Sequence, residues 1–180
     1  MKKKKYDQCL EEMFSLHRFV IKLGLDVIRH ILDHLKHPEK TFSCIHIAGT
    51  NGKGSIAAGL ASILQSSGYK VGLYTSPHLI RFNERITING IEVTDEEIVS
   101  SYLAVKAIPT TEMEPTFFDD TTTMALHLFA QSNVDWAIIE TGMGGRLDAT
   151  NELSPGLSII SNISMEQRFY LGNTIAEITG

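Results

Sequence analysis

The sequence predicts an α/β fold, a P-loop, Rossmann-like and mostly parallel sheet with helices on both faces. Short and almost wholly apolar runs alternate with segments of helical periodicity, which is typical of a parallel sheet buried on both sides. A glycine-rich run, residues 49–55, lies between the first apolar run and the helix after it. The 180 residues are 43% hydrophobic, which is ordinary for a globular chain and enough for one domain with a real core.

The composition excludes several classes of protein. A net charge of −5 gives no reason to expect a nucleic-acid partner. No apolar run approaches the roughly 20 residues of a membrane helix. Tyr6 to Gln8 interrupt the run Lys2–Lys5 before a signal-peptide core can form, so we interpret the lysines as a solvated tail. Cys9 and Cys44 are too far apart to suggest a disulfide framework or a zinc site, and we expect a cytoplasmic protein.

Residues 1–40 are predicted to be a helical segment that precedes a P-loop domain over residues 41–180. Two apolar sets repeat at helical spacing: Leu10, Met13, Phe14 and His17, then Leu25, Ile28, Ile31, Leu32 and Leu35. Gly24 separates them, so we expect two helices.

The remaining pattern supplies the sheet and its covering helices. Buried strands are predicted at residues 42–47, 70–74, 134–139 and 157–160. Helices are predicted at 56–64, from a capping box at Thr94 to about residue 107, and at 119–131. Asn89-Gly90 lies inside an alternating run, residues 85–93, which indicates a small hairpin.

The run Gly49–Ser55 is the main candidate for a binding site. Glycines allow backbone amides to turn toward a phosphate, and a helix N-terminus and Lys53 add positive potential. The run departs from a standard Walker loop, because Ile47 replaces its first glycine and Gly54 replaces the hydroxyl after the lysine. The hydroxyl that helps to hold magnesium must therefore come from Ser55 or from another segment. A plain strand-to-helix turn with a solvated lysine is the alternative interpretation.

Polar residues follow two other predicted strands. Glu140 ends the strand at 134–139, where its carboxylate can hold magnesium opposite the phosphate loop. An ordinary exposed glutamate is the alternative. Ser76 follows the strand at 70–74 and can supply the missing hydroxyl, whereas His78 is either a packed histidine or a ligand. Gly142–Asn151, with three glycines, an arginine and an aspartate, indicates a polar binding loop beside Glu140.

These motifs, in this order, resemble the folylpolyglutamate synthase and dihydrofolate synthase family, relatives of the Mur ligases. The matching stretches are Gly24–Asp26, His46–Ser55, Gly72–Arg85, Thr116–Phe118, Glu140–Asn151 and Leu171–Thr174. They run over nearly the whole chain, and they are specific only when taken together. The order Lys53-Gly54-Ser55, unusual for a Walker loop, is similar to that of this family.

The resemblance implies an ATP-dependent ligase that joins L-glutamate to dihydropteroate or tetrahydrofolate. ATP would phosphorylate the substrate carboxylate, and the glutamate amine would displace phosphate. The family's phosphate-binding positions match Thr50, Asn51, Gly52, Lys53, Gly54 and Ser55, with Lys53 and Glu140 as catalytic residues. Its magnesium ligands match Ser76 and Glu140, and its pterin-binding positions match Thr116, Phe118, Leu147, Asp148 and Ala149. An aromatic wall at Phe118 suits a flat ring.

The sequence departs from the family in three places. The family's Asp-His after the fourth strand, whose histidine holds a second magnesium, reads Glu166-Gln167 here, so Gln167 is a doubtful ligand. Asp119 replaces a family glutamate. The family continues with a carbamylated lysine and a glutamate-binding domain, whereas this sequence ends at Gly180. We therefore expect an incomplete ATPase domain that is inactive alone, with an uncovered surface that promotes dimerisation.

Two other functions are alternatives to a ligase. A degenerate nucleotide-binding or interaction module without catalysis is the alternative, and turnover would separate it from a ligase. A P-loop kinase is disfavoured by Gly54, where a kinase needs a hydroxyl.

Overall fold

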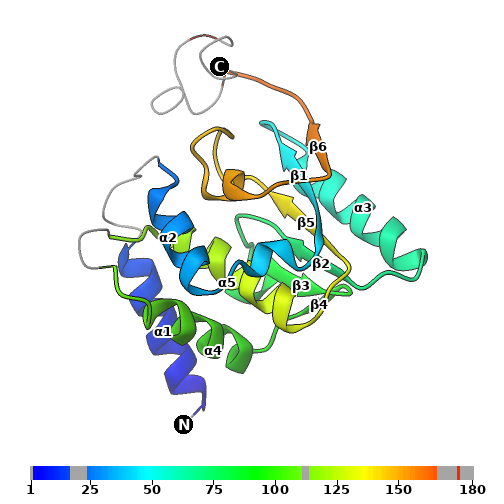
Figure 1. Cartoon of the computed structure of the whole chain (residues 1–180). Coiled ribbons are helices and arrows are strands. Elements are labelled where there is room, and N and C mark those ends of the chain that lie inside the picture. Colours follow the sequence, from blue (N-terminus) through cyan, green and yellow to red (C-terminus); the bar gives the residue numbers. More distant parts are fainter. Residues whose placement is uncertain (1, 17–23, 111–113, 166–173, 175–180) are drawn as a thin grey trace.

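The computed structural model of the protein describes residues 2–16, 24–110, 114–165 and 174 (Figure 1). Its α-helices are α1 (Lys2–Leu16), α2 (Asp26–His34), α3 (Lys53–Ser66), α4 (Asp95–Lys106) and α5 (Phe117–Gln131). Its strands are β1 (Ser43–Ala48), β2 (Val71–Tyr74), β3 (Ile86–Ile88), β4 (Ile91–Glu92), β5 (Trp136–Glu140) and β6 (Leu157–Ile160). Three short 3-10 turns are η1 (Pro38–Lys40), η2 (Phe82–Arg85) and η3 (Ala149–Glu152).

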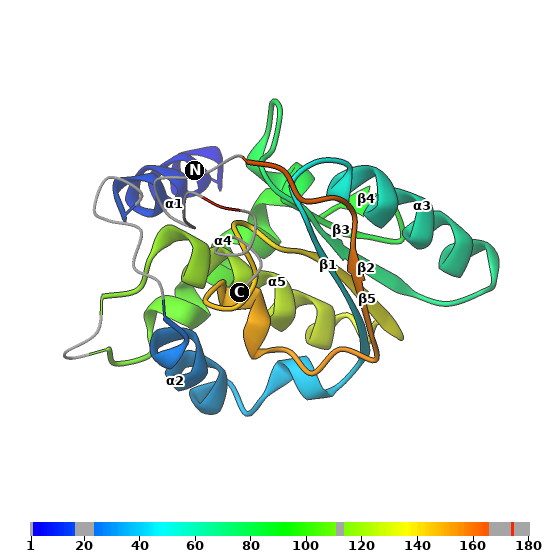
Figure 2. The same cartoon turned by 90° about the horizontal axis from the view of Figure 1, so that it is seen from above.

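The strands form one sheet in the order β4-β3-β2-β5-β1-β6. Strands β2, β5, β1 and β6 are parallel, and the hairpin β3–β4 adds two antiparallel strands at one edge. Helix α3 carries the chain from β1 past β5 to β2, and α4 and α5 bring it back to β5. Right-handed crossovers in opposite directions place their helices on opposite faces. Figure 2 shows α3 on one side of the sheet and α1, α2, α4 and α5 on the other. The predicted fold class is confirmed.

Two hydrophobic clusters cover the two faces of the sheet. Along β5, Ala137 and Ile139 belong to the larger cluster, shared with α1, α2, α4 and α5, whereas Ile138 packs in the cluster beneath α3. Because both faces are buried, successive side chains of the central strands are mostly apolar. This explains why the strands appear in the sequence as continuous apolar runs.

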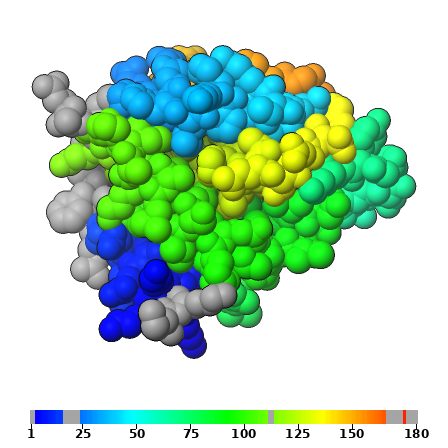
Figure 3. All heavy atoms as spheres, turned by 60° about the horizontal axis from the view of Figure 1, so that its bottom comes forward, coloured from blue at the N-terminus to red at the C-terminus, as the bar shows by residue number. Residues whose placement is uncertain are grey.

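The two N-terminal helices pack into the larger cluster. Cys9 and Met13 of α1 and Ile28 and Ile31 of α2 are buried with the residues of α5. Figure 3 shows α1, in dark blue, lying against the green residues of α4. The domain boundary at residue 40 stays a prediction.

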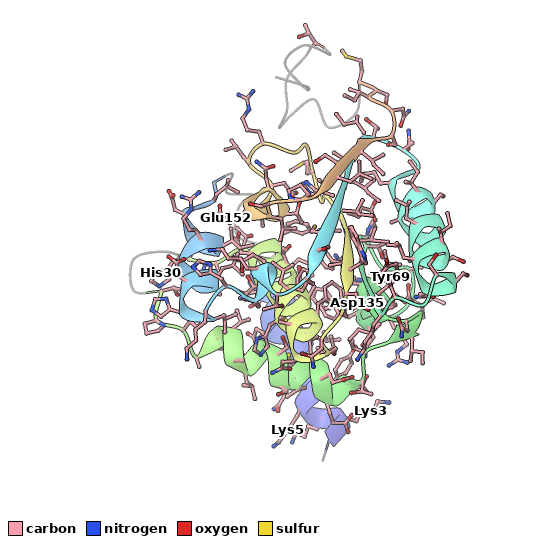
Figure 4. All side chains as sticks on the ribbon, turned by 45° about the vertical axis from the view of Figure 1, so that its right-hand side comes forward. Lys3, Lys5, His30, Tyr69, Asp135 and Glu152 are labelled. Carbon is pink, nitrogen blue, oxygen red and sulfur yellow. The ribbon has the colours of Figure 1, made fainter. Side chains whose placement is uncertain are left out.

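The prediction that Lys2–Lys5 form a solvated tail is wrong in one respect. The side chains of Lys3, Lys4 and Lys5 are exposed, but α1 already includes them. Figure 4 shows Lys3 and Lys5 at the outer end of this helix. Lysine is a good helix former, and the buried Tyr6 and Cys9 anchor the same helix to the core.

The capping residues set where the helices begin. The predicted box at Thr94 is present, since Glu97 N donates to Thr94 Oγ1 at 3.2 Å and Thr94 N donates to Glu97 Oε2 at 2.7 Å. A second box starts α5 at Phe117, two residues before the predicted start at 119. Here Asp119 Oδ2 accepts from Thr116 N at 2.8 Å, so the shorter carboxylate still caps the helix.

One edge of the sheet is exposed at β6. Leu157 is 49% exposed and Ile160 is 65% exposed. The predicted self-association through an uncovered surface stays a prediction. No helix within the described ranges combines the length and the apolar character needed to cross a bilayer.

Two glycine-to-alanine changes test this packing. A Cβ at Gly72 of β2 would lie 2.6 Å from Phe129 Cδ1 of α5. Gly72→Ala is therefore expected to lower the free energy of unfolding by about 1–3 kcal/mol, through overpacking. The control is Gly59→Ala on α3, where a Cβ meets nothing within 4 Å and the helix gains up to about 1 kcal/mol. Urea titration measures both, and an undiminished stability of Gly72→Ala would contradict the close packing of α5 on β2.

Candidate functional site

The carboxyl ends of the four parallel strands meet at one edge of the sheet. In the register of β1, Ile47 is opposite Glu140 of β5, and Ala48 is opposite Ile160 of β6. The glycine-rich loop therefore begins beside Glu140 and beside the segment that follows β6. Ser76, just after β2, reaches the same place, since its N–H donates to Glu140 Oε2 at 3.2 Å. Open parallel sheets bind ligands at this edge.

The glycine-rich loop has the backbone of a phosphate-binding loop. Gly49 has φ +130 and Gly52 has φ +82, a region that side chains other than glycine rarely adopt. Helix α3 begins directly after Gly52, which is its N-cap. Amide groups in the first turn of a helix lack intrahelical acceptors, so those of Lys53 to Ser55 can bind an anion. A Cβ at Gly52 would meet nothing within 4 Å.

Lys53 and Glu140 face each other across the start of α3. Lys53 Nζ donates to the carbonyl oxygens of Gly49 at 2.9 Å and Thr50 at 3.3 Å, and it lies 3.8 Å from Glu140 Oε1. A Cβ at Gly54 would lie 3.6 Å from Glu140 Oε2, so this glycine leaves space between the helix and the carboxylate. The structure thus brings Lys53 and Glu140, the two residues predicted to be catalytic, together at the loop.

Glu140 is a buried carboxylate, only 5% exposed. Burial raises its pKa above the ordinary value of 4.5, although the amide of Ser76 and the charges of Lys53 and Arg85 lower it. The alternative interpretation, an ordinary exposed strand-end glutamate, is therefore wrong. A buried carboxylate with perturbed pKa at such an edge is a typical functional group.

The segment after β6 holds the other side of the loop. Thr50 N donates to the carbonyl oxygen of Asn162 at 2.7 Å, and Asn51 N donates to Asn162 Oδ1 at 2.9 Å. Ser164 N donates to Thr50 Oγ1 at 3.0 Å. The amides of Thr50 and Asn51, two predicted cofactor-binding residues, are thus engaged within the protein. The amides of residues 52–55 are left to form the anion cradle.

The loop Gly142–Asn151 folds around Asp148. Its carboxylate accepts from the amides of Met143 at 2.9 Å and Thr150 at 3.0 Å, and from the Thr150 hydroxyl. The Thr150 hydroxyl also lies 2.8 Å from Nε2 of the buried His46 on β1. Asp148 is 6% exposed, and burial raises its pKa while these hydrogen bonds lower it. Asp148 therefore shapes the loop from within.

The other residues predicted for pterin binding lie around this loop. The Phe118 ring packs on Gly142, where a Cβ would lie 2.5 Å from Phe118 Cζ. Leu147 is 45% exposed, and Ala149 is buried. Thr116 caps α5 directly before this aromatic residue. Phe118 and the loop are thus brought together, with Leu147 as the exposed apolar member.

Arg85 belongs to the site but was not among the predicted residues. It is buried between aromatic rings, with its guanidinium carbon 5.8 Å from the centroid of Phe82 and 5.3 Å from that of Phe117. Its Nε donates to His78 Nδ1 at 2.8 Å, which shows that His78 is hydrogen-bonded rather than free. Its charge acts on Glu140. Arginine lies in the matched stretch Gly72–Arg85, but only folding reveals its partners.

Comparisons with known proteins agree on one family. No family model matches the chain. The chain is 45% identical over 169 residues to the dihydrofolate synthase/folylpolyglutamate synthase of Bacillus subtilis, covering 91% of this chain and 39% of the relative. It superposes on the Escherichia coli protein FolC, solved with DHPP and ADP, with a TM-score of 0.91 at 34% identity, over 96% of this chain and 42% of the other. The chain belongs to the dihydrofolate synthase/folylpolyglutamate synthase family. It corresponds to the amino-terminal part of these proteins.

Other family structures show the same correspondence. The folylpolyglutamate synthase of Thermotoga maritima has a TM-score of 0.88 at 38% identity, over 99% of this chain and 41% of that one. The Yersinia pestis bifunctional enzyme, complexed with AMPPNP and a manganese ion, has a TM-score of 0.88 at 35% identity, over 96% and 42%. The chain thus spans about two fifths of the length of the Bacillus subtilis and Escherichia coli relatives.

The residues in hand fit the magnesium ion that the family uses. Among the described residues, no group of three histidine, cysteine or acidic side chains is arranged to hold a metal. Magnesium usually takes one or two carboxylates, with waters and phosphate oxygens completing its shell. The buried Glu140, with Ser76 bonded to it, is such a donor set. Gln167 and residues 171–173 of the last matched stretch lie outside the described residues.

Glu140→Gln tests the electrostatics of the site. The pKa of Glu140 is raised in the fold, so its contribution to stability is present below pH 4.5 and is lost as the pH rises through the folded pKa. Relative to wild type, Glu140→Gln is therefore expected to become progressively more stable as the pH rises from below 4.5 through the folded pKa of Glu140. Urea titrations across this range measure the difference. A difference that stays constant with pH would show that burial does not perturb this carboxyl.

Proposed function

We propose that this chain supplies the Mg-ATP-binding part of a ligase that joins L-glutamate to dihydropteroate or tetrahydrofolate through an acyl phosphate. The observation that carries the proposal is the phosphate loop, with Lys53 3.8 Å from the buried Glu140 at the end of the neighbouring strand. Structures of relatives in complex with ADP, AMPPCP, and AMPPNP with manganese support a nucleotide as the ligand of this loop.

Each group has a role in the proposed site. The amides of residues 52–55 and the Lys53 ammonium bind and orient the ATP phosphates, and Lys53 offsets the charge that grows during phosphoryl transfer. Glu140 and Ser76 would hold magnesium, which when bound would supply further positive charge at the phosphates. Phosphoryl transfer to the substrate carboxylate then depends mostly on how well that carboxylate is placed in line with the terminal phosphate.

The substrate side of the site is proposed from the loop Gly142–Asn151. Phe118 and Leu147 offer an aromatic and an apolar surface that suit a flat pterin ring. Thr116, Asp148 and Ala149 keep that surface in place, through the cap of α5 and the folded loop. The Escherichia coli relative is solved both with DHPP and ADP and with ADP but without folate substrate, which supports a folate-type ligand.

Nucleotide binding is expected to depend on Lys53 and Glu140 in different ways. Lys53→Ala removes a charge-assisted contact to phosphate, so it should weaken ADP binding by roughly tenfold or more, with or without magnesium. Glu140→Gln should leave binding without magnesium intact, but abolish the gain in affinity that magnesium gives. Calorimetry with ADP, with and without magnesium, measures both. Equal affinities of wild type and Lys53→Ala would reject the loop as the nucleotide site.

A polypeptide of these 180 residues is expected to bind nucleotide without ligating glutamate. It spans 39% of its Bacillus subtilis relative, and holding both reactants together can supply roughly 7–11 kcal/mol of barrier lowering. The assay contains ATP, glutamate and dihydropteroate or tetrahydrofolate, with mass spectrometry of the product. Steady glutamylation would show that these residues are sufficient. Failure to bind either nucleotide or pterin would favour an interaction module.

A further inference from the structure

Hydrogen bonds hold the phosphate loop from two sides. On one side, Lys53 Nζ donates to the carbonyl oxygens of Gly49 and Thr50, at 2.9 and 3.3 Å. On the other, Asn162 accepts from the amides of Thr50 and Asn51, at 2.7 and 2.9 Å. The Gly49 carbonyl and the Thr50 amide belong to one peptide group, and the Thr50 carbonyl and the Asn51 amide to the next.

In a trans peptide group the carbonyl and the amide point in opposite directions. Two consecutive peptide planes of the loop therefore have Lys53 at their carbonyl ends and Asn162 at their amide ends. Turning either plane would break a bond on both sides at once. The orientation of the carbonyls that receive the lysine is thus coupled to the hydrogen bonds of Asn162.

The approach of the two segments is close enough to require Gly49. A Cβ at Gly49 would lie 2.1 Å from Ser161 Oγ and 2.9 Å from the Asn162 carbonyl oxygen. Ser161 N continues the β6 pairing by donating to the Ala48 carbonyl at 2.9 Å. Ser164 adds a third tie, from its N–H to Thr50 Oγ1.

We propose that Asn162 is a positioning residue: it latches the peptide planes of Thr50 and Asn51, and through them sets where Lys53 meets the nucleotide phosphates. The proposal rests on the proposed nucleotide-binding function. Without the latch, the Asn51 amide loses its partner and the peptide plane is free to turn. Nucleotide binding must then order the loop, which lowers affinity.

The first test does not require nucleotide. Asn162→Ala removes the acceptor of the Asn51 amide, so hydrogen exchange at that amide should quicken by about fivefold, the worth of a typical hydrogen bond. Asn162→Asp keeps an acceptor oxygen and should retain the protection. The matched control is Asp135→Ala at the amino end of β5, far from the loop. There Asp135 Oδ2 accepts from Lys70 N at 2.7 Å (Figure 4). It should leave exchange at Asn51 unchanged.

The second test asks whether Asn162 acts through Lys53. Asn162→Ala should weaken Mg-ADP binding by about fivefold, and by clearly less when Lys53 is already alanine, because coupled residues are not additive. Asp135→Ala should lower stability without this effect. Circular dichroism checks that the exposed Asn162 can be replaced without unfolding.

The outcomes separate the two proposals. Unchanged Asn51 exchange in Asn162→Ala, or strictly additive effects on Mg-ADP affinity, would overturn the latch. Absence of Mg-ADP binding by wild type would overturn the proposed function instead, and the exchange measurement would then decide the latch alone.

Discussion

Parallel pairing of β1 with β5 on one side and β6 on the other is the constraint on which the site depends. The register places Ile47 level with Glu140 and Ala48 level with Ile160. Because side chains alternate between faces along a strand, a shift by one residue would exchange Ile138 with its neighbours between the two apolar clusters and turn Glu140 to the other face. The two apolar clusters therefore hold the register. The loop after β1 consequently starts between a carboxylate and the segment that carries Asn162.

Burial disfavours the charged forms of Glu140 and Arg85, two ionisable residues of the site. Burial raises the pKa of Glu140, and it lowers the pKa of Arg85, whose guanidinium lies between two phenylalanine rings. Desolvation outweighs the attraction of Lys53, Arg85 and the Ser76 amide for the Glu140 carboxylate. Such a carboxylate gains most from a bound cation, which fits the proposed magnesium role. The buried carboxylate of Glu140 therefore lowers the stability of the fold when it is ionised, a cost that is common at functional sites.

The loops at this edge are tied to the strands and to the segment that follows β6. Hydrogen bonds link the Gly142–Asn151 loop through Thr150 to His46 inside β1, and link the phosphate loop through Asn162 to the end of β6. Phe118 fixes the first of these loops by packing on Gly142. A rigid sheet carrying short, individually anchored loops is the arrangement that lets polar groups from distant segments keep their relative positions.

Local sequence determined the strands, the helix caps and the phosphate loop, because each depends on neighbours within a few residues. The box at Thr94, the turn at Asn89-Gly90 and the run Gly49–Ser55 all formed as predicted. The family motifs also placed Glu140 and Ser76 correctly at one edge. Even so, α1 extends through the exposed lysines and α5 begins early, because tertiary packing and a cap at Thr116 decided those ends.

Tertiary structure alone decided the strand order, which inserts β5 between β1 and β2 and pairs β6 with β1, and with it the contact of Arg85 with the ring of Phe117 and the hydrogen bonds of Asn162. Asn162 contacts Asn51 across 111 positions of the chain. No local pattern encodes such a contact, because it arises only when the backbones of β1 and β6 pair and bring two strand ends within hydrogen-bonding distance.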